Sequence, residues 1–128
     1  AYSVSVNATE EAVPTNQITI EVNFDTAPFM ADEMLAIVQK EIDDLVKNGP
    51  SSSELENAQR YFNKLYKTNI STNSYWLGTF SDYYRYGIDN FTNYENTMNG
   101  LTPSDIRKFA KTVFGQKNKM EFVLLPKK

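Results

Sequence analysis

The sequence predicts an α+β fold, with a mainly antiparallel sheet and helices packed on one of its faces. Near the start of the chain, apolar and polar residues alternate with the period of two that is typical of a half-buried strand. The middle of the chain instead places apolar residues at helical spacing. Because strands and helices come in separate runs, α+β is the class that fits, and 128 residues are enough for one domain.

The first two predicted strands are residues 2–6 and 17–24. In the first, Tyr2, Val4 and Val6 alternate with polar residues, and the second shows the same alternation. A polar loop with Pro14 separates them, so we expect an antiparallel pair with one buried face.

Two helices are predicted to follow. After Pro28 the spacing becomes helical, and this helix ends at Gly49 and Pro50. Ser51 and Glu54 are spaced as a capping box at the start of the next helix, and a second such pair two residues later offers another register. The apolar faces predicted for these helices are Leu35, Val38, Ile42 and Leu45, and then Leu55, Ala58, Phe62 and Leu65.

Three further helices and a closing strand complete the prediction. The helices are expected from Asn73, as a cap, to near Gly87, then over residues 91–98, and finally from Thr102 to Gly115. Residues 119–126 are apolar on both faces at their centre, which predicts a strand inside the sheet. The buried stripe predicted for the last helix is Ile106, Phe109, Ala110 and Val113.

The composition excludes several kinds of chemistry. The chain has no histidine and no cysteine, so it cannot hold a Ser-His-Asp triad, a Cys-His pair or a disulfide. A zinc site would need carboxylates alone, which is rare. The net charge of −3 does not suggest a nucleic-acid partner, and no apolar run approaches the length of a membrane span. The basic stretch 107–128 is interpreted as a solvated surface.

Residues 75–94 hold eight of the seventeen aromatic residues. At helical spacing, the favoured interpretation is a core stripe of Trp76, Phe80 and Tyr84. The alternative is a set of stacking platforms for sugars or peptides.

Taken together, six segments in this order resemble the C-terminal part of a pitrilysin/insulinase-family zinc metallopeptidase domain, closest to bacterial members. The resemblance implies a processing-peptidase-like metalloprotease domain of which residues 1–128 are the second half, a partial C-terminal domain truncated on its N-terminal side. The segments are AYSVSV, ITIEVNF, LVKNGPSSSELENAQ, NSYWL, LTPSDIRKFAKTVF and MEFVLLP.

The resemblance also implies where the metal belongs. In this family the catalytic domain carries an H-x-x-E-H motif and a further glutamate ligand, and the motif glutamate activates a zinc-bound water. A chain without histidine is then the non-catalytic companion, with no catalytic residue, no metal ligand and no cofactor of its own. Its expected partners are that catalytic domain, in the same chain or in a partner subunit, and peptide substrates.

One residue matches a substrate-contacting position of the family. Companion halves contribute an Arg-x6-Tyr pair, and Tyr2 stands at the position of its tyrosine, suited to hold a substrate carbonyl or developing oxyanion. The arginine would lie seven residues earlier, before Ala1. An aromatic residue at the start of a buried strand face is an equally good interpretation of Tyr2.

The sequence thus predicts the C-terminal segment of a zinc metalloendopeptidase, inactive alone, that closes the chamber and helps to bind peptides. A bacterial periplasm or cell envelope fits this resemblance. Two alternatives stay open: a non-proteolytic companion subunit of the same fold, and an independent α+β binding module with an aromatic face.

Overall fold

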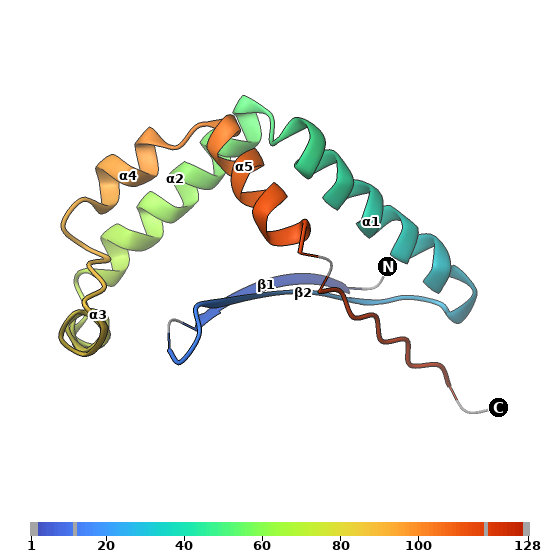
Figure 1. Cartoon of the computed structure of the whole chain (residues 1–128), viewed down its shortest axis with the longest axis horizontal. Helices are drawn as coiled ribbons and strands as arrows, with labels where there is room; N and C mark the ends of the chain where they lie inside the picture. Colours follow the sequence, from blue (N-terminus) through green and yellow to red (C-terminus); the bar gives the residue numbers. More distant parts are fainter. Residues whose placement is uncertain (1–2, 12, 117, 127–128) are drawn as a thin grey trace. The chain divides into compact units, whose positions relative to one another are not determined.

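The structure, a computed structural model, describes residues 3–11, 13–116 and 118–126 of a small α+β protein (Figure 1). The chain divides into two compact units, and each is described by itself. Unit 1 comprises residues 1–48 and 108–128, and unit 2 comprises residues 49–107. The elements are β1 (Ser3–Glu11), β2 (Gln17–Asp25), a 3-10 turn η1 (Pro28–Met30), α1 (Ala31–Asn48), α2 (Ser52–Asn69), α3 (Asn73–Tyr86), α4 (Tyr94–Gly100) and α5 (Pro103–Phe114).

The strands β1 and β2 form an antiparallel hairpin, which confirms the predicted pairing. Val4 lies opposite Phe24 and Val6 opposite Val22, so the apolar residues of both strands share one face. The prediction that this face is buried is wrong for β1, which is exposed along its whole length, and on β2 the face is half-buried. β1 is longer than predicted, because the pairing continues through polar residues to Glu11, into the start of the predicted loop at 10–16, and β2 extends one residue further than predicted, to Asp25. Among the described residues the sheet has these two strands.

The first two helices end and begin where the sequence predicts. α1 ends at Asn48, and Gly49 follows with φ of 76°, in the left-handed region that favours glycine. At the start of α2, Ser51 Oγ accepts the Glu54 N–H at 3.2 Å, and Glu54 Oε2 accepts the Ser51 N–H at 2.8 Å. The capping box is therefore confirmed in its first register.

The later helices differ from the prediction mainly at their starts. The cap of α3 is Thr72 rather than Asn73, since Thr72 Oγ1 accepts the Tyr75 N–H at 3.4 Å. Gly87 ends this helix with φ of 71°, as predicted. The short α4 begins at Tyr94, three residues after its predicted start. At the start of α5, Thr102 and Asp105 form a capping box: Thr102 Oγ1 accepts the Asp105 N–H at 3.3 Å, and the Asp105 carboxylate accepts the Thr102 N–H at 3.0 Å.

The closing strand predicted over residues 119–126 is wrong for this structure. These residues form neither a helix nor a strand, and Phe122 and Leu124 are exposed. The physical reason is that an apolar pattern indicates a preference for burial but does not show whether another strand is available to pair with the segment. No third strand stands beside this segment in the described part of the chain, so the preference is unmet.

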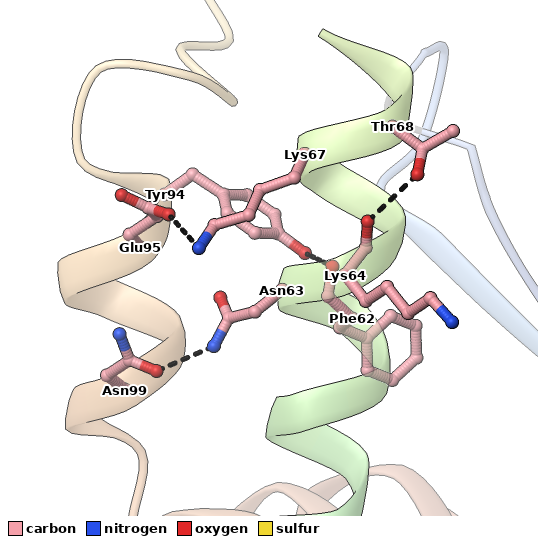
Figure 2. Close-up of polar contacts among 8 residues, drawn as sticks. All are labelled: Phe62, Asn63, Lys64, Lys67, Thr68, Tyr94, Glu95 and Asn99. Carbon is pink, nitrogen blue, oxygen red and sulfur yellow. Dashed lines mark hydrogen bonds and ion pairs between the residues drawn. The ribbon is translucent and has the colours of Figure 1, made fainter.

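The apolar face predicted for α2 is also largely wrong. Leu55 is buried, but Phe62 and Leu65 are exposed. The half-buried positions are instead Gln59, Asn63 and Tyr66, because that face of α2 lies against α4 (Figure 2). The face predicted for α1 is correct and half-buried throughout. In α5 the stripe is confirmed at Ala110, which is buried, whereas Phe109 is exposed.

Candidate functional site

The substrate-contact candidate Tyr2 lies outside the described residues. The structure describes its neighbour Ser3, at the first position of β1. Ser3 Oγ donates a hydrogen bond of 2.8 Å to the Asp25 carboxylate, directly across the hairpin. This hydrogen bond links the two strands at the end of the hairpin away from its loop. Tyr2 directly precedes this end in the sequence.

An aromatic cluster in unit 2 joins the helices α2, α3 and α4, and Trp76 is at its centre. Trp76 stacks on Phe80 with ring centroids 5.4 Å apart and meets Phe91 edge-on at 6.0 Å. Its indole Nε1 donates to the Ile70 carbonyl at 2.8 Å, so its polar edge is satisfied within the cluster. The cluster consists of Tyr66, Tyr75, Trp76, Phe80, Tyr83, Phe91 and Tyr94.

The core interpretation of these aromatics is correct for Trp76, which is half-buried, and wrong for Phe80 and Tyr84, because Phe80 is 44% exposed even though it stacks on Trp76. Tyr84 is 83% exposed, whereas Tyr83 is 44% exposed and meets the Phe91 ring edge-on, with centroids 6.1 Å apart. Leu77, about two turns before Tyr84 on the same face of α3, is 76% exposed. An apolar strip of α3 therefore faces solvent, and the pattern alone could not tell which tyrosine meets Phe91.

Tyr66 and Tyr94 form the tightest contact of the cluster. Burial raises the pKa of the Tyr66 phenol above its ordinary value, and the nearby Tyr75 and Glu95 raise it further. Burial likewise raises the pKa of Tyr94, with added effects of Tyr75 and Tyr66. A phenol is neutral at neutral pH even at its ordinary pKa of about 10, and the raised pKa values extend the neutral form of both residues to more alkaline pH.

Three side chains of α2 make polar contacts with α4 and with the residue that follows it, and we call this set of contacts the polar ladder. The Gln59 amide donates to the Met98 carbonyl at 2.9 Å and to the Leu101 carbonyl at 3.3 Å. Figure 2 shows the other two: Asn63 donates to the side chain of Asn99 at 2.7 Å, and Lys67 lies 4.0 Å from Glu95. The ladder fixes α4 against α2.

A shallow hollow of about 200 Å³ lies beside α4, and it is the part of unit 2 that the sequence analysis missed. Asp89 Oδ1 accepts the N–H groups of Phe91 at 3.1 Å and Thr92 at 2.9 Å. The pKa of Asp89 is lowered first by the Thr92 hydroxyl and then by these N–H groups. The carboxylate thus stabilises a turn. The hollow is lined by Asp89, Asn90, Asn93, Tyr94, Thr97, Met98 and Leu101.

Within residues 3–11, 13–116 and 118–126, no group of three His, Cys, Asp or Glu side chains could hold a metal ion. Two of the acidic residues act in a cap and a turn, Glu54 with Ser51 and Asp89 with Thr92. Over the same residues, no helix combines the length and the apolar character that crossing a membrane requires.

Comparison with known proteins adds no relative: no family model, no curated protein and no solved structure matches the chain.

Proposed function

We propose that this chain is the non-catalytic half of a zinc metalloendopeptidase of the pitrilysin/insulinase type, closing the chamber and helping to bind peptide substrates. The proposal rests on the ordered sequence segments and on the absence of histidine from the full sequence. The zinc and its H-x-x-E-H motif then belong to a catalytic partner domain, which supplies the activated water. The part left to this chain is to hold the substrate.

The observation that carries the proposal is the hairpin that begins one residue after Tyr2. β1 and β2 pair over nine residues each, and the Ser3–Asp25 hydrogen bond closes the end next to Tyr2. A paired strand is a stiff support for a neighbouring side chain that must meet a substrate oxygen within a narrow range of distances. A phenol in that position donates a hydrogen bond to the substrate carbonyl, and the bond strengthens as negative charge develops.

The test compares the chain alone with the chain joined to its catalytic partner. Alone, we expect no zinc-dependent peptide cleavage. In the complete enzyme, Tyr2→Phe should lower kcat/KM by roughly tenfold to a thousandfold, the usual cost of losing one oxyanion donor. Tyr61→Phe is a matched control, because Tyr61 is an exposed tyrosine on α2. An unchanged kcat/KM for Tyr2→Phe would remove Tyr2 from the site, and chelator-sensitive cleavage by the isolated chain would refute the proposal.

A second candidate function is an independent binding module, and the exposed strip of α3 favours it. Leu77 and Tyr84 offer an apolar and an aromatic side chain to solvent on one helix. This alternative predicts that Tyr84→Ser weakens binding of a peptide or oligosaccharide and leaves peptide cleavage by the complete enzyme unchanged. A companion subunit without protease function is recognised by the loss of both H-x-x-E-H and the arginine before Tyr2.

A further inference from the structure

The β1–β2 hairpin has an apolar face that is half-buried on β2 and open to solvent along β1. The cross-strand pairs Val4–Phe24, Val6–Val22 and Ala8–Ile20 lie on this face, since directly opposite residues of an antiparallel pair point the same way. Val6 is nevertheless 65% exposed. An isolated two-stranded hairpin is marginally stable in water, so this face gains free energy from any apolar surface that covers it.

A second open apolar feature lies in the same unit, over residues 120–125, which we call the tail. Its side chains differ in exposure with a period of two: Phe122 and Leu124 are 83% and 98% exposed, whereas Val123 is 50% exposed. Alternate side chains of an extended chain point to opposite sides, so one side of the tail is partly covered and the other is free. The free side carries Met120, Phe122 and Leu124.

The start of the tail is held on α1. Lys119 Nζ donates to the Gln39 side chain at 2.6 Å, and the same ammonium pairs with Glu121. Beyond this anchor the described residues of the tail pair with neither strand of the hairpin, although tail and hairpin belong to one compact unit. The contact between Lys119 and α1 restricts where the tail can lie relative to the hairpin of its own chain. It does not restrict where the tail can lie relative to the hairpin of a second copy.

The tail with its flanking residues and the hairpin carry opposite net charge. In the sequence, Lys119 precedes the tail and two lysines follow it at 127–128. The hairpin carries Glu10 and Glu11 next to its loop and Asp25 at its open end. Because Lys119 already pairs with Glu121 of its own chain, the complementarity is one of net charge: residues 119–128 carry three bases and one acid, whereas residues 3–25 carry four acids and no base.

We propose that two copies of this chain form a dimer in which the tail of each adds as a third strand to the hairpin of the other. The outer edge of the hairpin has backbone N–H and C=O groups that such a strand satisfies. Phe122 and Leu124 then extend the apolar face formed by Val6 and its neighbours. The exchange is symmetric, so it closes at two copies instead of growing into a fibre. This inference is independent of the proposed function.

The test is sedimentation of the full chain over a range of concentrations. We expect a monomer–dimer equilibrium, and Leu124→Asp should raise the dimer Kd at least roughly tenfold, because it places a charge against apolar side chains. Leu77→Asp is the matched control: Leu77 is an exposed leucine of unit 2, outside the proposed contact, so the Kd should not change. Circular dichroism confirms that both variants keep the helices.

Mixing two variants separates strand exchange from other kinds of dimer. Val6→Asp damages the hairpin and Phe122→Asp damages the tail, so each variant alone should be mostly monomeric. Their mixture contains one intact tail–hairpin contact per pair, and it should regain dimer. A chain that stays monomeric at all concentrations would overturn the proposal. A dimer that persists unchanged in Leu124→Asp would overturn it too.

Discussion

The ring of Tyr94 lies flat against the ring of Tyr66, with centroids 4.1 Å apart and ring planes 12° apart. Tyr94 is the first residue of α4 and Tyr66 is in the last turn of α2, so this contact joins the start of one helix to the end of another. Since α4 has seven residues, it is too short to be stable alone in water. The stacked pair is therefore expected to carry much of its stability.

Removing the Tyr94 ring should destabilise unit 2. We expect Tyr94→Ala to lower the free energy of unfolding by about 2 kcal/mol, from lost burial and lost stacking. Tyr94→Phe should cost less than about 1 kcal/mol, because the hydroxyl donates to the Phe62 carbonyl only at 3.5 Å (Figure 2). Urea unfolding followed by the fluorescence of Trp76, the one tryptophan, measures both. Equal losses for the two variants would mean that the hydroxyl, not the ring, matters.

The same pair predicts a loss of stability at alkaline pH. The folded state raises the pKa values of Tyr66 and Tyr94 above the unfolded value of about 10. Their contribution to stability is thus full below about pH 10 and is lost as the pH rises through the folded values. Urea unfolding at a series of alkaline pH values should show this decline, with a smaller decline in Tyr94→Phe. A decline of the same size in that variant would contradict the assignment.

Two glycines should respond oppositely to alanine. At Gly49, φ is 76° and an added Cβ would lie 2.9 Å from the Pro103 carbonyl oxygen, so Gly49→Ala should destabilise by at least about 1 kcal/mol. Gly78 lies inside α3 with no atom within 4 Å of an added Cβ, so Gly78→Ala should stabilise by about 0.5–1 kcal/mol. Thermal and urea unfolding of both variants provide the measurement. A stabilised Gly49→Ala would refute the steric argument.

Local features of the fold were predictable because short stretches of sequence determine them. The hairpin follows from alternation in residues 17–24, and helix ends follow from Gly49, Gly87 and the Ser51–Glu54 box, whose groups lie within a few residues of one another. The cap at Thr72 was missed because Asn73 is an equally good capping residue next to it.

Features that depend on distant partners were not predictable. The inward face of α2 carries Gln59 and Asn63, since α4 supplies hydrogen-bond partners that the spacing of apolar residues does not reveal. The residues 119–126 have the pattern of a buried strand, but a pattern does not provide the neighbouring strands. For the candidate site, Tyr2 remains a prediction from sequence resemblance. The hollow beside α4 was missed because its lining residues have no shared motif.

The polar ladder has a consequence for which changes of chain length this protein tolerates. Its donors on α2 are four residues apart, at Gln59, Asn63 and Lys67, and two of its acceptors on α4 share that spacing, at Glu95 and Asn99. Inserting one residue between those two acceptors rotates one of them by about 100° around the helix axis, away from its donor. A point substitution removes one contact and leaves the others in place. A one-residue insertion there means that Glu95 and Asn99 can no longer both face their donors on α2. Natural variation in α4 should therefore consist of replacements, with insertions confined to the connecting loop after Gly87.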